Sequence, residues 1–187
     1  MLLADLHLGK GEHFSRNGMA VPQGVQDDNF SRLQELLEEF EPDRVLFLGD
    51  LFHSHLNDTV ETFAVFISTH PEVSFALVMG NHDILPQALY NNSQLAIHQP
   101  PLRESPFIFT HFPLAVPDPD FYNFYGHLHP GVKLRGSGKE YLKLPCFHFG
   151  PSQAVLPAFG AFTGLALVKP RREDRVFVVV EDEVLEV

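Results

Sequence analysis

The chain has 187 residues, 44% of them hydrophobic, which is enough to bury one core and predicts a single domain over residues 1–187. Its near-average composition excludes disordered, collagen-like and coiled-coil chains. A formal net charge of -11 argues against general electrostatic affinity for nucleic acid, because phosphate binding needs clustered Lys and Arg.

The first half of the chain predicts short strands that alternate with helices. In order, we expect a strand over residues 2–5, a helix from Asp27 or Asp28 to Pro42, a strand over 44–48, a helix from Asp58 to Pro71, and a strand over 74–79. The first helix should pack through Phe30, Leu33, Leu37 and Phe40 and expose Glu35, Glu38 and Glu39, and the second should pack through Val60, Phe63 and Ile67. Continuous apolar strands separated by helices favour a largely parallel sheet.

The second half predicts a different sheet. We expect strands over residues 106–109 and 121–125, after which the pattern changes, and then strands over residues 141–149, 164–168 and 175–180, which form the second sheet. The last of these are joined by turns, such as the charged segment 169–174, so this sheet should be mainly antiparallel. The expected fold is α/β, with two stacked sheets flanked by helices.

A local basic stretch lies within this half of an otherwise acidic chain. It contains Lys133, Arg135, Lys139 and Lys143. One interpretation is a solvated hairpin, and the other is a surface that contacts a phosphate backbone.

Five separate motifs carry ligands for a hard metal ion. They are Asp5-Leu6-His7, Gly49-Asp50-Leu51-Phe52-His53, Gly80-Asn81-His82-Asp83, Thr110-His111 and Gly126-His127-Leu128-His129. Each follows a short hydrophobic run, so the strand ends should bring all five to one edge of the fold. Their carboxylate, amide and imidazole groups, without a thiolate, suit Mn²⁺, Fe or Zn²⁺.

These residue types predict a centre with two divalent ions. We assign Asp5, His7 and His129 to one ion and Asn81, His111 and His127 to the other, with Asp50 as the bridge. Such a pair of ions would hold a hydroxide that attacks a phosphate ester in line. His82 is the candidate proton donor to the leaving oxygen, and His53 is the candidate that assists it or contacts the phosphate. Asp83 is expected to position a histidine.

The motifs resemble those of the calcineurin-like metallophosphoesterases, in which the same five blocks occur in the same order over residues 5–129. Four stretches are similar to the DNA-ligase-associated metallophosphoesterase (PdeM) family: residues 4–10 (ADLHLGK), 126–130 (GHLHP), 144–147 (LPCF) and 156–164 (LPAFGAFTG). Phe112 stands where we expect an acidic residue after the histidine. The second and third motifs also resemble the SbcD-type repair nucleases, which favours DNA as the substrate.

The resemblance implies a four-layer α/β/β/α sandwich with a dinuclear centre that prefers Mn²⁺. It implies a metal-dependent phosphodiesterase or endonuclease that acts on DNA and is associated with a DNA ligase and a helicase in repair. Two alternatives remain: a phosphodiesterase for small cyclic or nucleotide diesters, and a non-catalytic interaction scaffold.

The cellular location is predicted from simpler features. The single cysteine, Cys146, has no disulfide partner within the chain, and we interpret it as a small buried hydrophobic residue. We find no signal peptide and no apolar run long enough to span a bilayer. We therefore expect a soluble cytoplasmic protein with no membrane partner.

Overall fold

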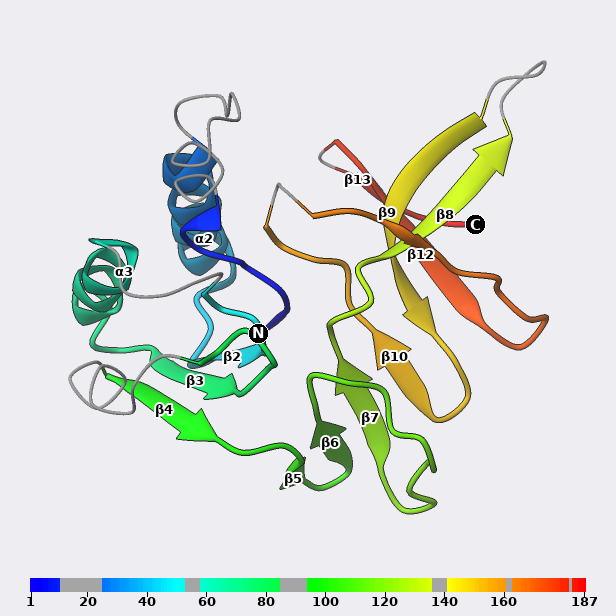
Figure 1. The fold of residues 1–187 in the computed structure, drawn as a ribbon, viewed down its shortest axis with the longest axis horizontal. Helices are drawn as coiled ribbons and strands as arrows, with labels where there is room; N and C mark the ends of the chain where they lie inside the picture. The colour runs from blue at the N-terminus through cyan, green and yellow to red at the C-terminus, as the bar shows by residue number, and fades with distance from the viewer. Residues whose placement is uncertain (11–24, 53–57, 85–93, 136–140, 161–162, 182) are drawn as a thin grey trace.

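The computed structural model describes residues 1–10, 25–52, 58–84, 94–135, 141–160, 163–181 and 183–187. Two β-sheets lie next to each other, and helices α2 (Val25–Phe40) and α3 (Asp58–Ser68) lie on the far side of the first sheet (Figure 1). The expected α/β fold with two sheets is confirmed. Within the described residues no helix lies against the second sheet, so these residues account for three of the four expected layers.

The first sheet is entirely parallel, as expected. Its order is β1 (Leu2–Leu3), β2 (Arg44–Leu48), β3 (Ser74–Val78) and β4 (Leu95–His98). Successive strands pair in parallel, with Leu2 beside Leu46 and Phe75 beside both Val45 and Leu95. The sequence did not predict β4, because four residues are too short a run to be told from a loop.

The second sheet is mixed. It contains β5 (Leu102–Glu104), β6 (Phe107–Phe109), β7 (Tyr122–Tyr125), β8 (Pro130–Arg135), β9 (Tyr141–Phe149), β10 (Gln153–Val155), β11 (Ala166–Leu167), β12 (Arg175–Val180) and β13 (Glu183–Glu186). The main path runs β11-β8-β9-β10-β7-β6-β5. Most pairs are antiparallel, as expected, but β7 is parallel to both β6 and β10, and β11 is parallel to β8.

The alternation of side chains along β2 explains how the layers stack. Val45 and Phe47 point to one face and pack with the helices, in a core that includes Leu33 and Phe63. Leu46 and Leu48 point to the other face and pack with Phe109 of the second sheet. Because both faces of the strand are buried, its sequence is a continuous apolar run, which is what made it recognisable.

The helices agree with the sequence except at the ends of α2. This helix begins at Val25, before the expected caps at Asp27 or Asp28. Phe40 was expected in its apolar stripe but is 62% exposed, because it lies in the last turn and borders a pocket instead of the sheet. Neither described helix is long and apolar enough to cross a membrane.

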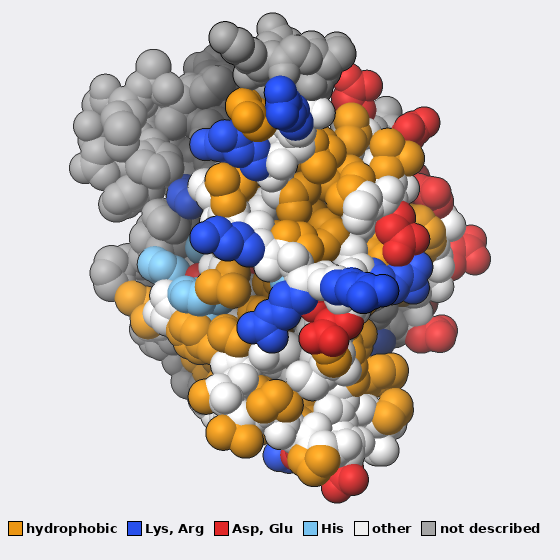
Figure 2. Space-filling view, turned by 90° about the vertical axis from the view of Figure 1, so that its right-hand side faces the viewer, with side chains coloured by type: hydrophobic (Ala, Val, Ile, Leu, Met, Phe, Trp, Pro, Cys, Tyr) orange, Lys and Arg blue, Asp and Glu red, His pale blue; other side chains and the backbone are white. Residues whose placement is uncertain are grey.

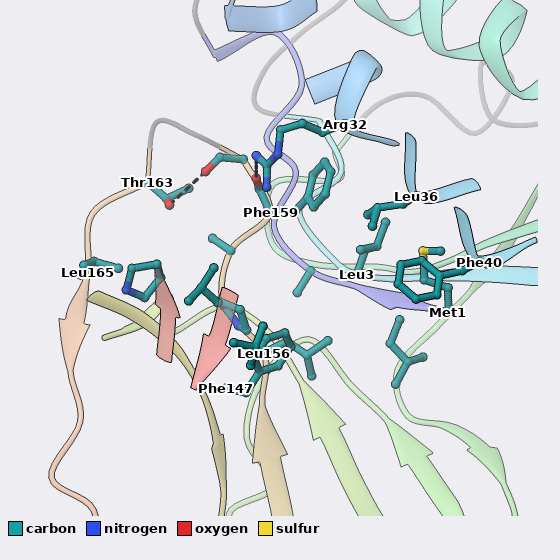
Figure 3. Close-up of a pocket in the computed structure, with 18 of the residues that line it drawn as sticks. Met1, Leu3, Arg32, Leu36, Phe40, Phe147, Leu156, Phe159, Thr163 and Leu165 are labelled. Atoms are coloured by element: carbon teal, nitrogen blue, oxygen red, sulfur yellow. Dashed lines mark hydrogen bonds between the residues drawn. The ribbon is translucent and has the colours of Figure 1, made fainter. Parts of the chain in front are cut away.

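A pocket of about 860 Å³ lies between α2, β1 and β9 (Figure 3). Its lining is mainly apolar and includes Leu3, Leu36, Phe147 and Phe159. At its rim Arg32 donates a 3.0 Å hydrogen bond to the carbonyl oxygen of Phe159 and lies over the phenyl ring of that residue. The predicted metal ligands do not line this pocket, so it is separate from the site described below.

Cys146 is fully buried in a third apolar cluster, with Val132, Val176 and Val178. Burial raises the pKa of its thiol to about 11. The thiol is therefore protonated and chemically inert at neutral pH, which confirms its interpretation as a small hydrophobic residue.

The aromatic packing under α3 gives a test of this core. Phe63 is 1% exposed, and its ring lies 5.8 Å from that of Phe47 and 5.6 Å from that of Phe52. We expect Phe63→Ala to lower the free energy of unfolding by about 3–5 kcal/mol, because it leaves a cavity. Val65→Ala on the exposed side of the same helix should change it by less than about 0.5 kcal/mol in the same urea titration. Equal effects of the two variants would contradict the packing.

Candidate metal centre

The residues predicted as metal ligands gather at the edge where the parallel strands end. Asp5 follows β1, Asp50 follows β2, Asn81 follows β3, His111 follows β6, and His127 and His129 lie between β7 and β8. Asp5, Asp50 and His111 are almost completely buried. The carboxyl ends of strands from both sheets therefore supply one site, as the motif order predicts.

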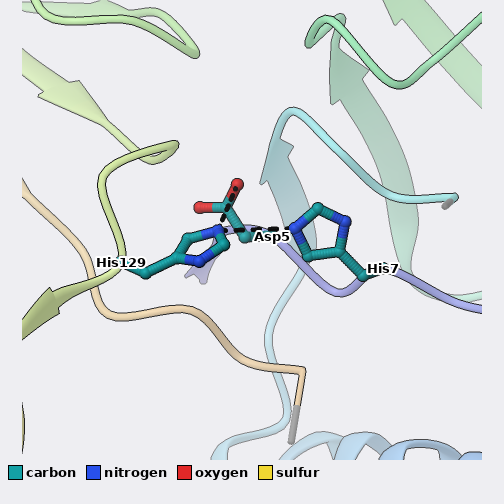
Figure 4. Close-up of side chains that lie close together, drawn as sticks. All are labelled: Asp5, His7 and His129. Carbon is teal, nitrogen blue, oxygen red and sulfur yellow. Dashed lines mark hydrogen bonds and ion pairs between the residues drawn. The ribbon is translucent and has the colours of Figure 1, made fainter. Parts of the chain in front are cut away.

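Asp5, His7 and His129 form the first ligand group (Figure 4). The Nε2 atoms of the two histidines are 3.4 Å apart, and His129 Nε2 lies 3.4 Å from Asp5 Oδ1. Asp5 Oδ1 is buried and accepts no hydrogen bond from the described residues, whereas Oδ2 accepts one from the backbone N–H of His127 at 2.8 Å. A buried carboxylate oxygen facing two imidazoles fits a divalent cation.

Asp50, His111 and His127 form the second ligand group. His111 Nδ1 lies 3.0 Å from the carbonyl oxygen of Leu48, to which it can only donate. In that neutral tautomer His111 Nε2 carries a lone pair, yet it faces Asp50 Oδ1 at 3.3 Å, His127 Nδ1 at 3.2 Å and Asn81 Oδ1 at 3.0 Å. This convergence of acceptors also fits a cation.

The electrostatics of Asp50 and His111 support the same conclusion. Burial raises the pKa of the Asp50 carboxyl, but its contact with His111 outweighs this effect and holds the pKa at about 2. Burial lowers the pKa of His111, and the contact with Asp50 raises it above its usual value. Asp50 and His111 therefore each favour the charged form of the other, and a bound cation would likewise favour the carboxylate.

The grouping of the ligands agrees with the sequence in its main division. Asp5, His7 and His129 lie together, and Asn81 contacts His111, as expected. Asp50 belongs to the second group by distance, and its role as a bridge stays a prediction.

Five of the predicted ligands have backbone conformations that side chains seldom adopt. The φ angles are 55° for Asp5, 48° for His7, 50° for Asp50, 66° for His127 and 47° for His129. Each such conformation costs free energy, and it persists only where the surrounding structure enforces it. The concentration of these conformations at one edge marks a functional site independently of residue type.

Asp83 binds backbone groups in place of the histidine that we expected. Its Oδ2 accepts the N–H groups of Asp50 and Gly80, each at 2.8 Å, and its Oδ1 accepts those of Leu51 at 2.9 Å and Phe52 at 3.4 Å. Burial raises the pKa of this carboxyl, while these hydrogen bonds oppose the effect. Asp83 therefore joins the loop after β2 to the loop after β3.

Of the two predicted catalytic histidines, His82 lies within the described residues. His82 is exposed, its backbone N–H donates a 2.9 Å hydrogen bond to Asp50 Oδ1, and its ring centre lies 5.7 Å from that of His7. It is thus at the surface of the site, where a substrate could reach it. His53 lies outside the described residues.

Two residues at the site were not expected. The Phe112 ring packs against His127 and His111, with centroid distances of 4.4 and 4.8 Å, and is 45% exposed. Lys10 is half-buried, which lowers its pKa, while the nearby carboxylates of Asp50 and Asp5 oppose that shift. A lone lysine at this position carries no sequence signal that distinguishes it.

Comparisons with known proteins agree with this geometry. The profile of a family described as calcineurin-like phosphoesterase matches residues 1–177. The chain is similar to the solved nuclease MPE of Pseudomonas putida, with 27% identity and a TM-score of 0.78 over 100% of this chain and 86% of that one. It shares the fold of YfcE, a phosphoesterase from E. coli, with 16% identity and a TM-score of 0.51 over 100% and 97% of the two chains. A comparison with curated proteins gave no significant match.

The role of Asp83 can be tested with an isosteric change. Asp83→Asn leaves one acceptor oxygen for four backbone N–H groups, and we expect the free energy of unfolding to fall by about 2–4 kcal/mol. The affinity for Mn²⁺ should fall as well, because Asp50 loses its support. Asp120→Asn, at an exposed position, is the control for urea titration and calorimetry. Identical behaviour of the two variants would refute the role of Asp83.

The two ligand groups predict the metal stoichiometry. Mn²⁺ titrated into the metal-free protein should saturate at two ions per chain, and His129→Ala should saturate at one. His70→Ala, after α3, is the matched control and should retain two. Calorimetry and metal analysis after dialysis give the count, and saturation of the wild type at one ion would contradict the assignment.

Proposed function

The chain belongs to the calcineurin-like phosphoesterase family and is a metal-dependent phosphoesterase, and we propose that its substrate is the phosphodiester backbone of DNA. The observation that carries this proposal is the pair of adjacent ligand groups, Asp5 with His7 and His129, and Asp50 with His111 and His127. A site for two cations suits displacement at phosphorus. The similarity to a nuclease over the full chain supports a nucleic acid as the substrate.

The residues of the site would have separate roles in metal binding and proton transfer. Both ligand groups and Asn81 would hold divalent ions, which polarise phosphate oxygens and lower the pKa of water. Asp50 is our candidate for the bridging position, and its Oδ1 lies 3.3 Å from His111 Nε2. We assign protonation of the leaving oxygen to His82, because its side chain is exposed beside Asp50. His53 stays our candidate for assisting His82.

Three finer features of the proposal rest on sequence resemblance. We infer from the resemblance that Mn²⁺ is the preferred metal. The mixed carboxylate, amide and imidazole ligands also suit Fe and Zn²⁺. We also infer that the enzyme works in the cytoplasm beside a DNA ligase and a helicase in repair. The matched family profile is broader than the DNA-ligase-associated family, and it does not address these partners.

A comparison of substrates tests the proposal. With Mn²⁺, we expect hydrolysis of a chromogenic phosphodiester and nicking of plasmid DNA, with little hydrolysis of the corresponding monoester. His82→Ala should lower both diester activities by about 100-fold while Mn²⁺ binding is retained, because a general acid contributes about that factor. His70→Ala should behave as the wild type.

Other outcomes would point to other functions. Hydrolysis of the monoester alone would identify a phosphatase. Hydrolysis of cyclic nucleotides without DNA cleavage would identify an enzyme for small diesters. Binding of two Mn²⁺ ions without any turnover would identify an interaction scaffold.

A further inference from the structure

The hairpin that follows the last ligand presents a basic face. Strands β8 and β9 pair antiparallel, with Lys133 opposite Lys143 and Arg135 opposite Tyr141. Residues directly opposite each other project to the same side of a sheet, so these four side chains share one face, and all four are exposed. We call this set the hairpin basic face. The alternate residues, such as Val132 and Leu144, pack in the apolar cluster on the other side.

The two lysines of the hairpin basic face have no carboxylate partner among the described residues. Neither Lys133 nor Lys143 forms an ion pair with a described carboxylate, whereas Arg44, Arg103 and Arg175 each do. Like charges directly opposite each other destabilise a strand pair. Lys133 Nζ lies 3.8 Å from the centre of the Tyr141 ring, so its ammonium stays on this exposed face. In a chain of net charge -11, two exposed lysines opposite each other favour an anionic partner.

The position of the face relative to the metal centre indicates which anion. Strand β8 begins at Pro130, directly after the ligand His129, so Lys133 lies about 13 Å along the strand from that ligand. A DNA strand held at the metal centre could therefore also reach this face with a neighbouring phosphate. Figure 2 shows Lys and Arg side chains gathered on a face that also shows histidine side chains.

We propose that the hairpin basic face binds the phosphate backbone of the DNA strand that is cleaved, beside the scissile bond. The inference rests on the proposed function, and it names the surface that holds the substrate. Of the two interpretations of the basic stretch, a solvated hairpin and a phosphate contact, the inference adopts the phosphate contact. The metal centre would hold the scissile phosphate while the hairpin holds a second point on the same strand.

The decisive variant is Lys143→Glu. Because the new carboxylate faces Lys133, the variant gains an opposite-charge pair in place of a repulsive one, so its melting temperature should not fall. We expect the Kd for a 20-base-pair duplex to rise about tenfold, and the slope of log Kd against log salt concentration to fall by about one to two. For a small chromogenic diester, kcat/KM should stay within about twofold of the wild type, since that substrate cannot reach the hairpin. Lys143→Gln should change the Kd in the same direction by less.

The matched control is Arg103→Glu, which makes the same change in net charge. Arg103 lies on β5, at the other end of the sheet path from β8 and about 24 Å away at the usual strand spacing. Its Kd for the duplex and its salt dependence should match the wild type. An equal loss of affinity in this control would show a general charge effect and overturn the proposal.

The remaining outcomes separate this inference from the proposed function. Normal DNA affinity and salt dependence in Lys143→Glu would overturn the hairpin contact while leaving the nuclease proposal intact. If the wild type hydrolyses the small diester but not DNA, DNA is not the substrate. The Kd values of wild type and Lys143→Glu for the duplex still show whether the hairpin basic face binds DNA. Absence of DNA binding by the wild type would overturn both.

Discussion

The buried carboxylate of Asp83 holds together the two loops on which the metal centre depends. It accepts three backbone N–H groups from the loop after β2 and one from the loop after β3. The backbone N–H of Asp50 donates to Asp83, and the side-chain carboxylate of Asp50 faces His111. A buried charge is costly, and four hydrogen bonds to one carboxylate offset much of that cost. The geometry of the centre is thus set by a residue that need not touch a metal.

The centre stores unfavourable free energy that a cation would release. It contains buried carboxylates, a cluster of facing lone pairs, and five ligands with positive φ angles. A ligand that binds only the folded state stabilises that state, so metal binding and folding should be strongly linked in this protein. The same linkage explains why such a costly arrangement can persist at one edge of a well-packed α/β core.

The sequence predicted those parts of the molecule in which local pattern and tertiary role coincide. Strand β2 and helix α3 were placed correctly, because an apolar run and an amphipathic stripe directly express burial on two faces and on one. The predicted ligands lie together because motif chemistry and strand ends coincide, and their roles, like those of His82 and His53, stay predictions. Strand β4, the exposure of Phe40 and the backbone contacts of Asp83 were missed. Strand β4 is too short to show a pattern of its own, and the other two features depend on neighbours distant in the sequence that no local pattern encodes.

The ligands of the centre are far apart along the chain, and this sets when the protein can become active. His7 contacts His129, and Asp5 contacts His127, in each case across 122 residues. During synthesis, the amino-terminal ligands leave the ribosome long before their partners exist, and domains generally fold as units. A partly made chain would therefore lack both complete ligand groups. A newly synthesised phosphoesterase of this kind would remain inactive until its two sheets have docked.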